Sequence, residues 1–127
     1  GTVDAQLSTP TLFEIYLTNI IYEALNRGTI PVLTTIPNHP DHLWLEGLAM
    51  NAVILDLAER EDVPLINLWR ALLALPNFGL APQDNFHLLE VGASTHFGGG
   101  EETQFGMSQR NLLTLQMLDI IRTQLLQ

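Results

Sequence analysis

The spacing of apolar residues along the chain alternates between the patterns of helices and of buried strands. The first regular stretch follows Thr9 and Pro10, which suit the N-cap and the first position of a helix. Its apolar residues recur at helical spacing, at Phe13, Leu17, Ile20, Ile21 and Ala24. Gly28 fits the position that follows a helix. A helix is therefore predicted between Pro10 and Gly28.

Two short apolar runs predict buried parallel strands. The segment IPVLTTIP, residues 30–37, is rich in β-branched residues and contains a proline near each end. The segment DVPLINLW, residues 62–69, has a similar character. Between them, NHPDH at residues 38–42 is expected to be a loop that leaves the first strand.

Helical spacing returns between and after these strands. Residues 43–60 predict a second helix, and residues 108–126 predict the last one. A short helical turn is expected at residues 70–75. Residues 76–83, with two prolines and a glycine, and residues 92–106, with successive glycines, are expected to be loops.

The order of helix, strand, helix, strand, loop and helix indicates the α/β fold class, with a parallel sheet covered by helices. No internal repeat or linker is visible, so residues 1–127 are expected to form a single domain. Two buried parallel strands do not make a stable sheet by themselves. We therefore expect another chain, or an N-terminal segment ahead of this sequence, to supply further strands.

Charge and composition exclude several classes of function. The 127 residues have a net charge of −9, and all five basic residues are arginines. Such a surface repels phosphate backbones, so nucleic acid is not an expected partner. The absence of cysteine excludes disulfides, thiolate chemistry and cysteine-bound zinc. No apolar stretch approaches the roughly 18 residues of a membrane span, and no signal peptide is visible, so secreted and cytoplasmic locations both stay open.

Candidate chemistry is expected at one edge of the sheet, because open parallel sheets bind ligands beyond the carboxyl ends of their strands. Residues 1–4, residues 38–42 and the loop with Asp84 and His87 are expected there. A histidine that acts as a general base needs one ring nitrogen fixed and the other free. Asp84 and His87, within DNFHL, can meet this need on one turn. This spacing alone is also typical of a solvated turn.

A wider succession of segments gives the pair its context. GTVD is followed by RGTIPVLTTIP, NAVILDLAEREDVPLINLW, DNFHL and FGMSQRNLLTLQMLD. This order resembles the SGNH (GDSL-type) hydrolases, a family of serine esterases, lipases and carbohydrate deacetylases. The resemblance implies a three-layer α/β/α sandwich with a flavodoxin-like parallel sheet, of which this chain is similar to the C-terminal part. It also implies that His87 is the catalytic base and Asp84 its orienting acid, that the substrate is a small-molecule ester, and that no cofactor is needed.

The nucleophile that the resemblance implies is a serine in a G-D-S motif near the N-terminus. No such motif surrounds Ser8, Ser94 or Ser108. The serine is therefore expected from a missing N-terminal segment or from a companion chain, and this chain alone is expected to be inactive.

A second departure concerns the oxyanion. The family usually has a G-x-N-D motif, whose asparagine donates a hydrogen bond to the oxyanion. Gly1, Thr2 and Asp4 match this motif, but Val3 stands in place of the asparagine. Valine cannot donate, and the loss of one oxyanion donor typically lowers the rate on the order of 100- to 1000-fold. Three alternatives stay open: other donors suffice, the site is weakened, or Val3 is an engineered or natural inactivation.

Another polar cluster follows the first strand. His39, Asp41 and His42 have the spacing of part of a zinc site. Asn38 and His39 are also candidates for substrate contact at the sheet edge. No distant further ligand other than His96 is evident, so a plain surface loop is the preferred interpretation and no metal is expected.

Three functions stay open. The first is an SGNH-type esterase or lipase to which this chain contributes the base and the acid. The second is a non-catalytic relative that binds a carbohydrate or a protein; Val3 favours it, and the retained Asp84 and His87 oppose it. The third is an unrelated α/β module, such as a nucleotide-binding unit, which the lack of a glycine-rich phosphate loop after a strand disfavours.

Overall fold

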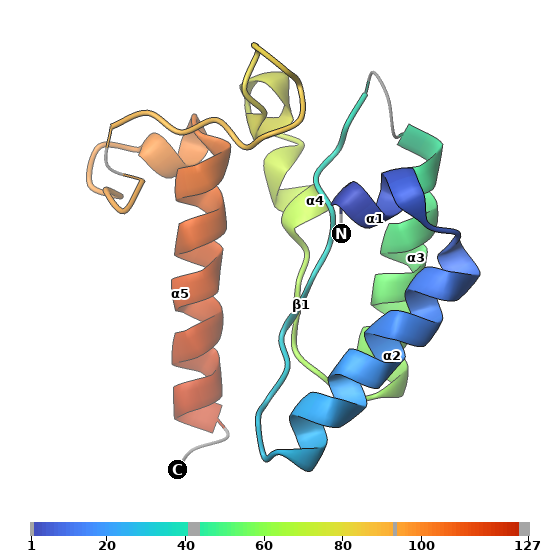
Figure 1. Ribbon diagram of the computed structural model, residues 1–127. Helices are drawn as coiled ribbons and strands as arrows, with labels where there is room; N and C mark the ends of the chain where they lie inside the picture. Colours follow the sequence, from blue (N-terminus) through green and yellow to red (C-terminus); the bar gives the residue numbers. More distant parts are fainter. Residues whose placement is uncertain (1, 41–43, 93, 125–127) are drawn as a thin grey trace. The chain divides into compact units, whose positions relative to one another are not determined.

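Helices dominate the computed structural model, which describes residues 2–40, 44–92 and 94–124 (Figure 1). The elements in chain order are α1 (Thr2–Leu7), α2 (Pro10–Asn26), β1 (Leu33–Thr34), α3 (Trp44–Arg60), β2 (Leu65–Ile66), α4 (Leu68–Leu72), the 3-10 turns η1 (Pro76–Gly79) and η2 (Glu101–Thr103), and α5 (Gly106–Gln124). The chain divides into two compact units, Gly1–Asn67 and Leu68–Gln127. The α/β class is confirmed, whereas the single domain stays a prediction. Within the described residues, no helix is both long and apolar enough to span a membrane.

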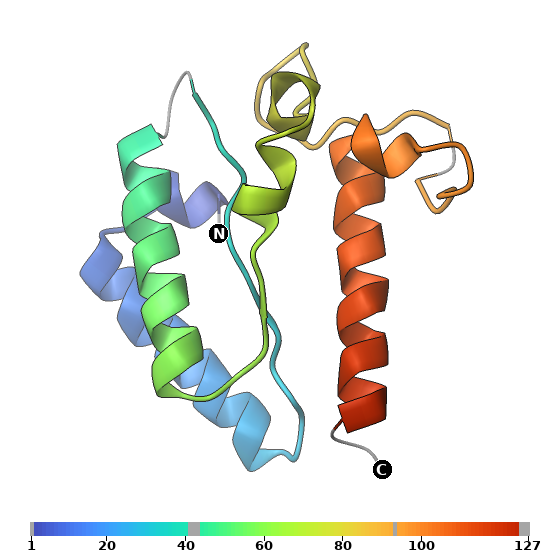
Figure 2. The same ribbon diagram turned by 180° about the vertical axis from the view of Figure 1, so that it is seen from behind.

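Helix α2 begins and ends at its sequence signals. The Thr9 hydroxyl accepts a hydrogen bond from the Leu12 N–H at 3.3 Å, and Pro10 is the first helical residue. Arg27 is the C-cap, and the φ of Gly28 is 70°, a left-handed conformation that costs glycine little. In both views, α2 lies beside α3, with which it packs (Figures 1 and 2).

The two strands pair in parallel as predicted, but they are much shorter than residues 30–37 and 62–69. Each contains two residues, with Leu33 opposite Leu65 and Thr34 opposite Ile66. A hydrogen bond from the Thr35 N–H to the Ile66 carbonyl, at 3.1 Å, continues the ladder. Thr34 is exposed, so the prediction of a strand buried on both faces is wrong at this position. The reason is that the described residues supply no third strand to extend the sheet.

A buried amide connects the end of β1 to α3. Asn51 is 6% exposed; its side-chain oxygen accepts from the Ile36 N–H at 2.7 Å, and its nitrogen donates to the Ile36 carbonyl at 3.0 Å. The amide thereby satisfies both backbone groups of one residue, as a neighbouring strand would. On the same helix, Met50, Ile54 and Leu57 are buried and form part of the core.

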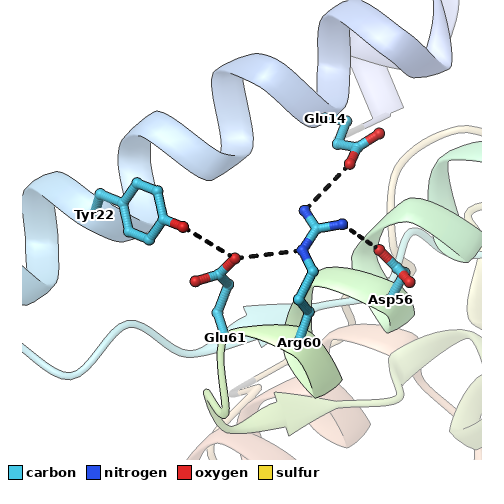
Figure 3. A network of polar contacts seen from close by, with 5 residues as sticks. All are labelled: Glu14, Tyr22, Asp56, Arg60 and Glu61. Atoms are coloured by element: carbon cyan, nitrogen blue, oxygen red, sulfur yellow. Dashed lines mark hydrogen bonds and ion pairs between the residues drawn. The ribbon is translucent and has the colours of Figure 1, made fainter.

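A network of charged side chains joins α2 to the last turn of α3 (Figure 3). The Arg60 guanidinium lies 2.8 Å from Asp56, 3.2 Å from Glu14 and 3.4 Å from Glu61. The hydroxyl of Tyr22 donates to Glu61 at 3.3 Å, and this hydrogen bond raises the pKa of Tyr22 above its ordinary 10.0. Glu14 and Tyr22 belong to α2, so the network links the two helices. Because most of these side chains are exposed, each pair stabilises the fold only slightly.

Several boundaries differ from the prediction. Residues 2–7, expected to precede the first helix, form α1, whose Ala5 is buried and which packs against α3. Helix α4 begins at Leu68 and ends at Leu72, earlier than the predicted turn at residues 70–75. The expected loops at residues 76–83 and 92–106 contain η1 and η2. Tertiary contacts support helices this short, because their local propensity alone does not.

In the second unit, η1 contacts the first turn of α5 through two glycines. Gly79 has a φ of 71°, and a Cβ built on it would lie 2.8 Å from the Gly106 Cα. A Cβ built on Gly106 would collide with the Gly79 carbonyl oxygen. Only glycine at both positions allows this approach, which fixes the start of the loop that carries Asp84 and His87.

Candidate active site

Asp84 and His87 meet on one tight turn. The Asp84 Oδ1 accepts hydrogen bonds from the backbone N–H groups of Phe86, at 2.9 Å, and His87, at 3.0 Å. The Asp84 Oδ2 lies 2.7 Å from Nδ1 of the His87 ring. Asn85, between them, has a φ of 51°, a left-handed conformation that asparagine tolerates better than most residues. One carboxylate therefore binds the backbone of the turn through Oδ1 and the imidazole through Oδ2.

These hydrogen bonds determine the charge of Asp84 and the tautomer of His87. They lower the pKa of the Asp84 carboxyl from 3.8 to about 2; the His87 ring is the largest cause, followed by the two backbone N–H groups. The carboxylate is then ionised at neutral pH and can only accept hydrogen bonds. The hydrogen shared with His87 must sit on Nδ1, so Nε2 has the lone pair of the neutral ring. A general base of the serine hydrolase type requires this tautomer.

The loop around the turn is closed by backbone pairing. The Ala81 N–H donates to the His87 carbonyl at 2.8 Å. Leu80 and Leu88 form an isolated antiparallel bridge, and Leu80 is fully buried. The base of the loop is thus anchored in the core of its unit, which limits how far the turn can move.

The His87 ring is open to solvent in this chain. Its side chain is 75% exposed and that of Asp84 is 43% exposed. The Phe86 ring meets the imidazole edge-on, with 5.2 Å between the ring centroids. Among the described residues of this unit, neither Ser94 nor Ser108 hydrogen-bonds to His87; Ser94 bonds elsewhere and Ser108 is fully buried. The unit thus presents an imidazole in contact with a carboxylate, and neither described serine of the unit hydrogen-bonds to His87.

Residues 38–40 have no helix or strand, as the predicted loop requires, but Asn38 is 4% exposed and His39 is 3% exposed. The interpretation of the His39, Asp41 and His42 cluster as a plain surface loop is therefore wrong at His39. Asn38 and His39 come just after Ile36 and Pro37, and the buried Asn51 of α3 hydrogen-bonds to the Ile36 backbone. A substrate role for Asn38 and His39 stays a prediction. No group of three or more potential ligands in the described ranges is arranged to hold a metal, and Asp41 and His42 lie outside those ranges.

The oxyanion candidates lie at the start of the other unit. Val3 belongs to α1 and is 55% exposed, and Gly1 lies outside the described residues. Residues 1–4 and 38–42 belong to the unit Gly1–Asn67, whereas Asp84 and His87 belong to the unit Leu68–Gln127. The meeting of these three segments at one sheet edge therefore stays a prediction.

Sequence reasoning missed Asn77, which contacts the turn from outside it. The Asn77 side-chain nitrogen donates to Asn85 Oδ1 at 2.8 Å and to the Leu80 carbonyl at 3.2 Å. The available signal was PNFG, residues 76–79, because Pro, Asn and Gly together are typical of turns with left-handed residues.

Sequence reasoning also missed an apolar pocket of about 430 Å³ in the first unit. Tyr16 and Ile20 of α2 line it together with Val32, and Asp4 is the acidic residue of the lining. Ile20 was predicted on the apolar face of the helix, yet it is 62% exposed. The volume lies within the range of small-molecule pockets.

No protein-family model matches this chain, and neither a curated protein nor a solved structure matches it.

Proposed function

We propose that this chain supplies the catalytic base and its orienting acid to an ester-hydrolysing serine hydrolase of the SGNH type. The observation that supports the proposal best is the 2.7 Å contact between Nδ1 of His87 and Oδ2 of Asp84. It selects the tautomer in which Nε2 can take the proton of a serine hydroxyl. The order of segments, which resembles that of the SGNH hydrolases, supplies the reaction class.

The proposed reaction uses one imidazole in two successive steps. Nε2 of His87 accepts the serine proton as the serine oxygen attacks the ester carbonyl, and returns a proton to the departing alcohol as the acyl-enzyme forms. The same nitrogen then takes a proton from a water that attacks the acyl-enzyme carbonyl, and returns a proton to the serine oxygen as the carboxylic acid leaves. Asp84, ionised at neutral pH, stabilises the imidazolium in both steps.

The serine is proposed to come from an N-terminal segment or companion chain outside these 127 residues. The 75% exposure of the His87 side chain is compatible with a further segment that covers the ring. In the same proposal, β1 and β2 are later strands of a three-layer, flavodoxin-like sandwich. The incoming segment would then add strands to the sheet together with the nucleophile.

The test is an esterase assay of the protein expressed with its upstream sequence, using short p-nitrophenyl esters. His87→Ala is expected to lower kcat about 100- to 10,000-fold, because it removes the general base. His96→Ala is the matched control, since His96 is another exposed histidine of the same unit and should leave kcat unchanged. The difference in rate between the wild type and His96→Ala also measures the slow ester cleavage that an exposed imidazole causes.

A covalent probe makes the test independent of turnover. A fluorophosphonate should label one serine in the wild-type protein, as intact mass shows, and label His87→Ala far more slowly. Equal labelling and equal kcat for the two proteins would rule the proposal out.

A non-catalytic binding module is the second candidate, and the apolar pocket of about 430 Å³ favours it. An apolar lining suits an apolar ligand or protein side chain better than a carbohydrate. Under this alternative, the protein with its upstream sequence has no esterase activity, and Val3→Asn gains none. Ile20→Asp should then weaken the fluorescence of a bound anilinonaphthalene dye, whereas Ile120→Asp, at a 46% exposed position of α5, should not.

A further inference from the structure

Asn77 and Asn85 are eight residues apart in sequence, yet their side-chain amides are in contact. The Asn77 nitrogen donates to Asn85 Oδ1 at 2.8 Å and to the Leu80 carbonyl at 3.2 Å. Asn85 directly follows Asp84, and its left-handed φ of 51° turns the chain back toward the Asp84 carboxylate. The backbone N–H groups of the next two residues then reach Asp84 Oδ1. The contact from Asn77 therefore acts on the residue whose conformation forms the turn.

Asn77 is itself fixed from the side of the core. Asn77 and Phe78 have left-handed φ values of 47° and 55°, and Gly79 follows with 71°. Such conformations persist in residues with a side chain only where the surroundings determine them. Here the Leu80 N–H donates to the Asn77 carbonyl at 3.0 Å, and Gly79 lies against Gly106 of α5. The backbone of Asn77 is thus held in place, so its side-chain amide donates to Asn85 from a defined position.

We propose that Asn77 is a positioning residue for the Asp84–His87 pair. By holding Asn85 in its left-handed conformation, it keeps one carboxylate in contact with both the backbone and the ring of His87. Without this contact, Asn85 gains access to other backbone conformations, in which the hydrogen bonds to Asp84 no longer form together. The inference deepens the proposed function and rests on it for its catalytic meaning, but the geometry can be measured without catalysis.

The test follows the titration of the Asp84 carboxyl carbon by NMR in the full 127-residue chain. Asn77→Gly keeps a residue suited to the left-handed region and removes only the amide. We expect it to shift the pKa of Asp84 upward from about 2 toward the ordinary 3.8, because the hydrogen bonds that lower this pKa form less often. Asn85→Gly removes the same contact from its other side and should give a similar shift. The two shifts should be less than additive in the double variant, because both single variants lose the shared contact between Asn77 and Asn85.

The outcomes separate positioning from general stability. A folded Asn77→Gly variant with an unchanged Asp84 titration would overturn the proposal, as would fully additive shifts in the double variant. Circular dichroism establishes that each variant is folded, and Asn85→Gly provides the same test if Asn77→Gly does not fold. In the protein with its upstream sequence, Asn77→Gly should lower kcat and leave KM unchanged. Asn77→Gly could shift the Asp84 pKa upward while the wild-type protein with its upstream sequence has no esterase activity. This result would support the positioning role and contradict the proposed function.

Discussion

Asp84 is partly exposed, yet its ionisation is coupled to folding. Its pKa is about 2 in the folded chain and 3.8 for the unperturbed carboxyl, which is the reference for the unfolded chain. Because the folded pKa is depressed, the carboxylate stabilises the fold above about pH 3.8, and this contribution is lost as the pH falls through about 2. The side chain is 43% exposed, so solvent screens its interactions and the contribution is small.

Asp84→Asn tests this coupling. Asparagine keeps an oxygen that can accept from the N–H groups of Phe86 and His87, but it loses the charge. We expect a slightly lower free energy of unfolding than the wild type at neutral pH, and a difference that shrinks below about pH 4 and disappears near pH 2. Urea unfolding across this pH range measures both proteins. A difference that does not change with pH would show that the charge of Asp84 plays no part in stability.

Asn51 connects two elements, and its removal should affect both. In Asn51→Ala, the buried N–H and carbonyl of Ile36 lose their partners. Each unsatisfied buried group costs about 1–3 kcal/mol, so we expect the free energy of unfolding to fall by about 2 kcal/mol or more. Asn19→Ala is the matched control, because Asn19 is an exposed residue inside α2 and alanine favours helix. Equal denaturant midpoints for the two variants would contradict the role assigned to Asn51.

The contact of η1 with α5 gives a second prediction about paired elements. Gly106→Ala would place a Cβ against the Gly79 carbonyl, so the turn must shift away from the helix. Overpacking of this kind costs about 1–3 kcal/mol in the free energy of unfolding. Gly47→Ala in α3 is the control, since its Cβ meets nothing within 4 Å and alanine should stabilise the helix by about 0.5–1 kcal/mol. Thermal or denaturant unfolding should therefore move the two variants in opposite directions.

The elements that sequence predicted well are those with local signals. Thr9, Pro10 and Gly28 define the two ends of α2 through capping chemistry that acts within a few residues. Helix α1 has six residues, too few for a helix to form by its own propensity, so it depends on contact with α3. The length of β1 was overestimated for a related reason, because a strand extends only as far as it has a partner.

The candidate site also combines features that local sequence signals predict with features that depend on the fold of the chain. The contact of Asp84 with His87 needs only one turn, so a separation of three residues allows it. That spacing is also typical of a solvated turn, and the order of segments along the chain was needed to prefer the pair. The part played by Asn77 depends on left-handed residues in PNFG and on the approach of α5, neither of which leaves a periodic pattern. The burial of Asn38 and His39 likewise depends on the fold around them, because a polar, proline-containing segment is locally typical of a surface loop.

The net charge of −9 makes a prediction about the molecule as a whole. The chain has fourteen acidic residues and five arginines, so repulsion among the acidic side chains opposes folding. Exposed ion pairs, such as that of Arg27 with Glu23, stabilise the fold slightly. Salt screens both effects, but repulsion acts over the whole surface and each exposed pair contributes little. We therefore expect the urea midpoint to rise when NaCl is increased from about 10 to about 150 mM. Replacing the exposed Glu59 and Glu90 by Gln should reduce this rise, whereas a midpoint that falls with salt would mean that the ion pairs outweigh the repulsion.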